Sequence, residues 1–202
     1  MKKPLIIIII VIIVAGVGIY FATQGTKTEN INQAEPATNS AGNTNNASAQ
    51  ENTYIGEDFT ILQPADWTQG QIPGTLVSFH NTGEVQPEGS AAKKINFQSY
   101  LAISFDLANE RSLAEINDLT INQIKATIPS AEVITTNDET IDGQPAKVDI
   151  LTLSQQEVDY TVFMAVISKD DKYYAITGNT TTDKWAEYKD MFYATARSFT
   201  ME

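Results

Sequence analysis

The chain has 202 residues, with 25 acidic and 13 basic side chains, and its formal net charge at pH 7 is −12. Cysteine is absent, which excludes disulfide bonds, thiolate metal sites, cysteine nucleophiles and a lipid-modified amino-terminal cysteine. Lysines and glutamates cancel within residues 1–52, so the negative charge belongs to residues 53–202, whose surface is expected to repel nucleic acid and anionic lipid headgroups.

The first feature of the chain is an uninterrupted apolar run at residues 5–22, preceded by Lys2 and Lys3. A helix of this length rises about 27 Å, which nearly spans a hydrocarbon core of about 30 Å. The run predicts a single transmembrane anchor, and the preceding lysines place residues 1–4 in the cytoplasm and the rest of the chain outside. A signal peptide is the alternative, and its cleavage would give a secreted protein, but its apolar region is normally about 7–15 residues long.

Residues 23–52 are dominated by Asn, Thr, Ala, Gln, Ser and Glu and contain almost no large apolar side chains. Such a segment cannot bury enough surface to offset the entropy of folding, so it is predicted to be a disordered linker. As a flexible coil it has a root-mean-square reach of roughly 30 Å. Residues 53–202 are then one globular domain, large enough to form a core without disulfides.

The first part of this domain is expected to be mostly strand. Apolar and β-branched residues bounded by Pro, Gly and Asn predict three strands, at Phe59–Leu62, Thr75–His80 and Ile95–Leu107. A change of period then predicts a helix over residues 112–127. Ser112 and Glu115 have the spacing of a capping box, and Ile116 and Ile124 repeat on one face of the helix.

The second half returns to strands, at Val133–Thr140, Ala146–Ile150, Val158–Ile167 and Tyr173–Thr177. Asp142-Gly143 predicts a tight hairpin turn between the first two of these, because a type I′ turn needs positive φ at both central residues. Val158–Ile167 is apolar on both faces after Tyr160 and is expected to be a central strand.

A second helix is predicted over residues 182–197, with Thr182 as N-cap and Asp183 favourable at the positive end of the helix dipole. An aromatic and small-residue stripe at helical spacing is expected to pack on the sheet rather than to bind a ligand. Its members are Trp185, Tyr188, Phe192, Thr195, Ala196 and Phe199.

Three motifs in order resemble those of PsbP-like domains. Tyr54 with Phe59–Ile61 and Pro64–Trp67 resembles the family's opening pattern, Ile141–Ala146 resembles its I-D-G-x-P-A hairpin, and Trp185–Phe199 resembles its last helix and closing S-F. The resemblance covers residues 54–200. It implies an α+β fold of the α/β/α sandwich type, with helices on both sides of a mainly antiparallel central sheet.

The resemblance implies a binding role rather than a reaction, because the matching residues are structural and bring no catalytic set with them. Photosynthetic members bind a membrane complex and influence calcium and manganese, but this chain has a single histidine, His80. We therefore expect a membrane-tethered, extracytoplasmic, non-enzymatic accessory module for a protein or another envelope component. A small-ligand or calcium-binding module is the first alternative, and an envelope hydrolase using two carboxylates is the last.

Two sets of residues are candidates for a site. Acidic side chains near turns could contribute oxygen ligands for calcium, although Asp and Asn are also favoured at turns for backbone reasons. These weak candidates are Asp138, Glu139, Asp142, Asp170 and Asp171. The second set could line a binding groove and comprises Trp67, His80, Tyr173 and Tyr174. No cofactor and no nucleic-acid partner is expected, and the sequence does not define the oligomeric state.

Overall fold

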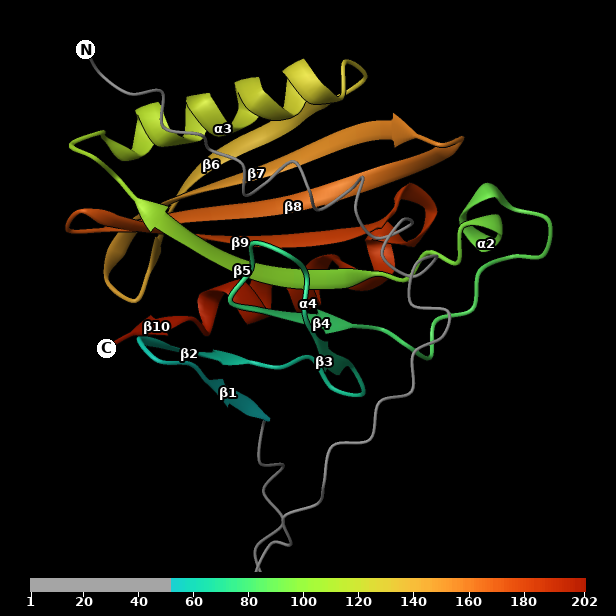
Figure 1. Ribbon diagram of the computed structural model, residues 1–202, viewed down its shortest axis with the longest axis horizontal. Helices are drawn as coiled ribbons and strands as arrows, with labels where there is room; N and C mark the ends of the chain where they lie inside the picture. The colour runs from blue at the N-terminus through green and yellow to red at the C-terminus, as the bar shows by residue number, and fades with distance from the viewer. Residues whose placement is uncertain (1–51) are drawn as a thin grey trace, which may run out of the picture.

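The computed structural model describes residues 52–202 (Figure 1). The predicted cytoplasmic end at 1–4, the predicted anchor at 5–22 and residues 23–51 of the predicted linker lie outside the described residues. The elements follow in chain order as β1 (Thr53–Ile55), β2 (Phe59–Leu62), β3 (Thr68–Gly70), β4 (Val77–His80), α2 (Ala91–Lys94), β5 (Tyr100–Leu107), α3 (Leu113–Thr127), β6 (Glu132–Ile141), β7 (Gln144–Gln155), β8 (Val158–Lys169), β9 (Lys172–Thr181), the 3-10 helix η1 (Thr182–Lys184), α4 (Trp185–Arg197) and β10 (Thr200–Met201).

The main sheet has seven strands in the order β3-β4-β5-β9-β8-β7-β6, and every neighbouring pair is antiparallel. Its largest part is a meander from β6 to β9, closed by tight turns. At the first turn Asp142 and Gly143 have φ of 52° and 71°, as the Asp-Gly signal predicts. A smaller sheet joins β1, β2 and β10 (Figure 1). The predicted antiparallel sheet is thus confirmed.

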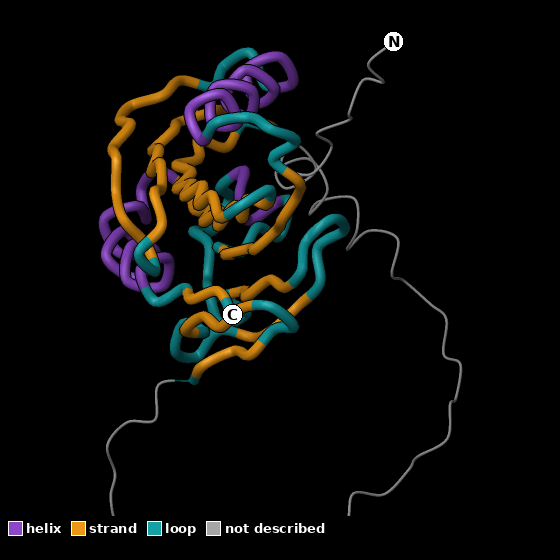
Figure 2. Tube along the Cα trace, turned by 90° about the vertical axis from the view of Figure 1, so that its left-hand side faces the viewer, coloured by secondary structure: helices purple, strands orange, loops and turns teal. Residues whose placement is uncertain are grey.

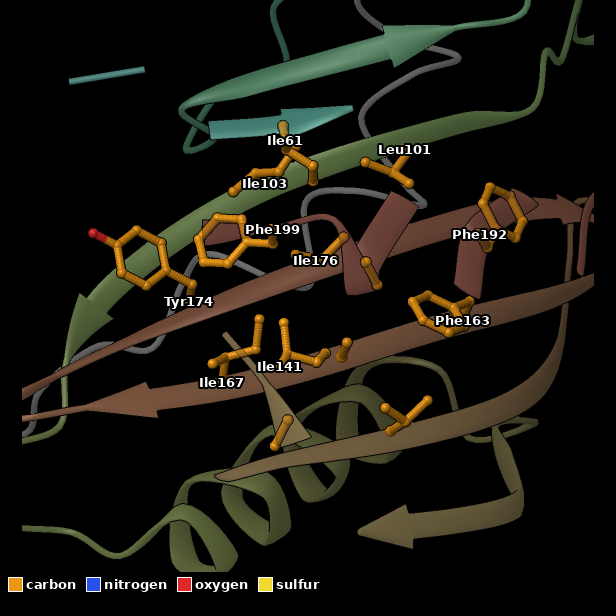
Figure 3. Close-up of a cluster of buried hydrophobic side chains, with 14 of the residues drawn as sticks. Ile61, Leu101, Ile103, Ile141, Phe163, Ile167, Tyr174, Ile176, Phe192 and Phe199 are labelled. Atoms are coloured by element: carbon orange, nitrogen blue, oxygen red, sulfur yellow. The ribbon is translucent and has the colours of Figure 1, made fainter. Parts of the chain in front are cut away.

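Helices α3 and α4 cover opposite faces of the sheet, and Figure 2 shows strands lying between them. Alternate residues of β8 belong to two separate cores, because successive side chains of a strand point to opposite faces. Val162 and Met164 pack in the core that contains Ile116 and Ile124 of α3. Phe163 packs in the core that contains Phe192 of α4, which Figure 3 shows beside it. The expectation that β8 is a central strand apolar on both faces is confirmed.

Both predicted helices are present, and the first has the expected start. The Ser112 hydroxyl accepts the Glu115 amide N–H at 3.3 Å, and the Glu115 carboxylate accepts the Ser112 amide N–H at 2.8 Å. On α4 the predicted stripe is core, with Tyr188, Phe192 and Ala196 all buried. Within residues 52–202, no helix is both long enough and apolar enough to cross a membrane.

Several boundaries differ from the expected ones. Strand β5 begins at Tyr100 rather than Ile95, because the preceding residues form the short helix α2, which ends before Asn96 at a φ of 54°. Strand β9 runs to Thr181, four residues beyond the expected end. Thr182 is not the N-cap of α4, since it begins η1 and the helix itself starts at Trp185. Strands β1, β3 and β10 and helix α2 were not expected.

Candidate functional site

The acidic residues around the β6–β7 hairpin are engaged with other parts of the domain. The Asp138 carboxylate lies 2.6 Å from Lys147 Nζ. Glu139 on the same strand binds the Arg197 guanidinium through two hydrogen bonds, of 3.0 and 2.9 Å, which connect the hairpin to the end of α4. Asp142 Oδ2 accepts the Met201 amide N–H at 2.8 Å and so holds β10. These three carboxylates therefore do not converge on one point.

The acids of the β8–β9 turn have local contacts. Asp170 has a φ of 54°, as the turn requires, and the Asp171 carbonyl accepts the Ala108 amide N–H at 2.7 Å. Across residues 52–202, no three His, Cys, Asp or Glu side chains are grouped so that they could hold a metal ion. The five acidic candidates thus serve turns and ion pairs of the fold.

Three of the four residues predicted to line a groove are divided between the two cores. Trp67 and Tyr174 belong to the core beneath α4, whereas Tyr173 belongs to the core beneath α3. The Trp67 ring packs edge-on against Tyr188, at 5.7 Å between centroids, and only 7% of the residue is exposed. Because successive strand residues point to opposite faces, these side chains do not line a common groove.

His80 forms the pair that a hydrolytic mechanism would first suggest, since its Nε2 lies 2.9 Å from Ser78 Oγ. Its ring stacks on Tyr100 at 5.7 Å, and burial lowers the pKa of the imidazole. Ser78, however, is 0% exposed, so its hydroxyl is closed to a substrate. The pair is a hydrogen bond between alternate residues of one strand.

A buried polar network joins the loop after β4 to β5 and α4. The Glu84 side chain is 0% exposed, and its carboxylate accepts the Ser99 amide N–H at 2.5 Å, the Ser99 hydroxyl at 2.9 Å and the Tyr188 hydroxyl at 3.0 Å. Lys184 Nζ lies 3.6 Å from the same carboxylate. Burial and the Glu84 carboxylate together raise the pKa of the Tyr188 phenol well above its ordinary value. The network fixes the loop against the start of α4.

A pocket of about 450 Å³ lies beside this network, where the loop and α2 approach the β7–β8 turn and the junction of β9 with η1. Acidic, hydroxyl, amide and apolar side chains share its wall. The lining residues are Gln86, Pro87, Ser90, Ala91, Ala92, Glu157, Val158, Asp159, Thr181, Thr182 and Asp183.

No local pattern in the sequence indicates this pocket, because its wall comes from three separate stretches of chain, within residues 86–92, 157–159 and 181–183. Asp183 was singled out only as a favourable charge at a helix start, and Gln86 and Glu157 carry no motif. The one general signal is the polar character of the Asn179–Asp183 run at a strand end. Burial of Thr181 and Gln86, at 4% exposed each, follows from tertiary packing alone.

Residues 52–202 thus define an α+β domain with an antiparallel sheet, a helix on each face and one acidic pocket at the edge of a buried polar network. The chain belongs to the PsbP family, which it matches over residues 49–201. The resemblance read from the three motifs is confirmed, and the match covers the whole globular part.

Two solved structures show the same fold. Cyanobacterial PsbP (CyanoP) from Synechocystis sp. PCC 6803 is similar with a TM-score of 0.57 and 16% identity, over 79% of this chain and 98% of that one. LpqN of Mycobacterium tuberculosis, involved in cell envelope biogenesis, is similar with a TM-score of 0.56 and 13% identity, over 72% and 84% of the two chains. A comparison with curated protein sequences finds no match. At these identities the likeness concerns the fold.

Proposed function

We propose that this protein is a non-catalytic accessory module, tethered to the membrane by residues 5–22, which binds a protein or another envelope component on the outer side. The observation that carries the proposal is family membership across the whole globular domain, combined with the engagement of the polar groups that a reaction would need. The similarity to LpqN, a protein involved in cell envelope biogenesis, supports an envelope setting.

The chemistry of the described residues supports binding over catalysis. Ser78, the hydroxyl next to the single histidine, is fully buried, and the Glu139 carboxylate is held by Arg197. A two-carboxylate hydrolase needs a pair of free acids facing each other across a cleft. The five acids singled out from the sequence, Asp138, Glu139, Asp142, Asp170 and Asp171, lie instead at two separate hairpins of the fold.

The proposal is tested by crosslinking the full-length protein in intact cells and isolating it from detergent-solubilised membranes. We expect a specific crosslinked partner that is absent when an unrelated domain is fused to residues 1–52 in place of residues 53–202. Recovery of the same products with both proteins would contradict binding by the PsbP domain.

The orientation is tested separately by adding protease to intact cells. The proposal expects residues 53–202 to be digested while a cytoplasmic marker protein survives, because positive charges precede the apolar run. Protection of the domain in cells whose surface proteins are digested would overturn the orientation. Release of the domain into the medium would instead indicate cleavage of the apolar segment.

Binding of a small ligand is a second candidate function, favoured by the pocket of about 450 Å³. Pockets of about 300–1,000 Å³ with apolar walls and a few polar groups are typical of small-ligand sites. Calcium that binds the folded state would raise Tm as its concentration rises. A calcium titration that leaves Tm unchanged would therefore exclude calcium as the ligand.

A further inference from the structure

We propose that the pocket beside α2 binds an alkylammonium or alkylguanidinium group, that is, a basic nitrogen carried on a short aliphatic chain. The inference deepens the proposed binding function by naming the chemistry of the partner. Four features of the pocket support this ligand: its rigid frame, its acidic rim, one buried hydroxyl and its apolar wall.

The pocket is held by rigid contacts on two sides. Glu84 connects the loop that carries Gln86 to β5 and α4 through its bonds to Ser99 and Tyr188. On the opposite side the β7–β8 turn has φ of 53° at Gln156 and 63° at Glu157, the signature of a tight two-residue hairpin. A site assembled by such contacts loses little entropy when a ligand binds.

The charge of the pocket is negative and uncompensated. Glu157, Asp159 and Asp183 line it, and no lysine or arginine is among its lining residues. Lys184, which follows Asp183 directly, is engaged with Glu84 instead. In the described part of the chain, none of these three acids takes part in an ion pair, although the Asp159 carboxylate accepts the Ser154 hydroxyl. A cation entering the pocket would therefore meet carboxylates without competing with an internal cation.

Thr181 gives an independent indication of a ligand. It lines the pocket and is 4% exposed, yet its Oγ1 has no hydrogen-bond partner. It pairs with Tyr160 across the sheet, so both side chains point to the same face, where Tyr160 packs in one core with Val158 and Ala92 of the pocket wall. A buried hydroxyl without a partner costs free energy, and an N–H donor in the pocket would satisfy it.

The remaining wall selects an organic cation rather than a metal ion. Pro87, Ala91, Ala92 and Val158 offer apolar surface against which methylene groups can lie, as lysine and arginine stems do elsewhere. A calcium ion would need about 6–8 oxygen ligands, and residues 52–202 contain no cluster of three or more side chains suited to a metal.

Local explanations exist for each acid but do not account for the pocket. Asp183 complements the positive end of a helix, Glu157 occupies a turn, and the Asp159 carboxylate accepts the Ser154 hydroxyl. None of these explanations requires the three acids to share a cavity with an unpartnered hydroxyl. Two kinds of molecule carry such an ammonium group: a free alkylamine, and a protein partner with a basic side chain.

The test measures binding to the full chain in an uncharged detergent by calorimetry. The probes are 1,5-diaminopentane for the free amine and a short peptide with one central lysine for the side chain. We expect at least one of them to bind saturably, whereas 1,5-pentanediol and the same peptide with acetylated lysine do not. The probe that binds more tightly identifies the source. Failure of both cationic probes, or equal binding of the neutral ones, would overturn the inference.

Two pairs of variants locate the binding. Replacing Glu157 and Asp183 together by Gln and Asn is expected to lower affinity about tenfold or more, because charged hydrogen bonds are lost. The same charge change at Glu187 and Asp190, exposed on α4 outside the pocket, is expected to change affinity by less than about twofold. Equal effects of the two pairs would show attraction by net charge alone and would contradict the site.

Thr181→Val tests the hydroxyl with its shape preserved, and Thr177→Val is the matched control. Thr177 lies on the same strand and face, is 2% exposed and also has an unpartnered Oγ1, but it does not line the pocket. We expect weaker binding, by several-fold, for the first variant only, with both melting close to the natural protein. A crosslinked partner unaffected by the pocket variants would contradict this inference and leave the proposed function standing.

Discussion

Asp149 is the residue whose position is most costly to the fold, because its carboxyl is buried between α3 and the sheet. It is 0% exposed; Oδ1 accepts the Thr136 hydroxyl at 2.5 Å, while Oδ2 has no partner. Burial raises the pKa of this carboxyl, an effect that hydrogen bonding by the Thr136 and Asn117 side chains and the charge of Lys147 only partly oppose. A charge is thus kept in the interior at neutral pH with incomplete compensation.

The raised pKa predicts how stability changes with pH at this residue. Between the unfolded value, near 3.8, and the higher folded value, the folded state binds more protons, so stability falls as pH rises through that window. Asp149→Asn removes this loss, and we expect its Tm at pH 7 to exceed that of the natural protein by about 2–4 °C, roughly 1 kcal/mol in a domain of this size. The gain should vanish below the unfolded pKa.

Thermal unfolding between pH 3 and pH 8 measures this effect. Asp190→Asn, which makes the same charge change at an exposed position of α4, is the control for general charge effects. A lower Tm of Asp149→Asn at pH 7 would show that the carboxylate contributes more through Thr136 than its burial costs.

Single residues also show where sequence reasoning reaches its limit. Trp67, a candidate groove residue from the sequence, packs instead in the core beneath α4, because its ring covers the sheet end. Glu84 was missed, since an acid after Asn81-Thr82-Gly83 is typical of a solvated loop. Its partners Ser99 and Tyr188 lie 15 and 104 residues further along the chain, and no local pattern connects them.

At the scale of elements, local signals predicted the long pieces and missed the short ones. The Ser112–Glu115 box and the Asp142-Gly143 turn act within a few residues, and both are present as expected. Strands β1 and β3 have three residues each and β10 has two, too few for a period to be visible. Strand β10 exists because β2, far away in the sequence, pairs with it, and that pairing is set by the tertiary fold, whereas β3 pairs with the nearby β4.

The packing of α4 on the sheet depends on a glycine of β9. A Cβ at Gly178 would lie 2.6 Å from Cδ1 of Phe192, a ring that is 0% exposed. Since real Cβ contacts are longer than 3.0 Å, Gly178→Ala forces the ring or the helix to move. We expect a loss of about 1–3 kcal/mol in the free energy of unfolding, as for other overpacked cores, measured by urea denaturation.

Two further variants show whether this loss comes from the contact with the ring. Gly83→Ala, where a new Cβ would lie 3.7 Å from Asn81 Oδ1, should be close to neutral. Combining Gly178→Ala with Phe192→Leu should cost less than the sum of the two single changes, because the smaller side chain leaves room for the methyl group. Strict additivity would contradict the contact as the cause.

At the scale of the whole molecule, the net negative charge is the property with the widest consequences. The chain carries −12 at pH 7 and has a calculated isoelectric point near 4.4. Ion pairs such as Lys147–Asp138 and Arg197–Glu139 bring opposite charges together locally, but most acids among residues 52–202 take part in no ion pair. Self-repulsion of like charges destabilises the compact state, whereas it also keeps the protein soluble and directs basic groups towards it.

The balance of these two effects predicts a response to salt. Because the Debye length falls from about 30 Å at 0.01 M to about 3 Å at 1 M, added NaCl screens repulsion across the whole surface more than it screens short ion pairs. We expect Tm at pH 7 to rise by several degrees between these concentrations, and to change little near pH 4.4, where the net charge is close to zero. Sodium sulfate is a poor substitute, since it strengthens apolar burial as well. A Tm that falls with NaCl at pH 7 would contradict this prediction, because it would show that the ion pairs stabilise the fold more than the surplus of acids destabilises it.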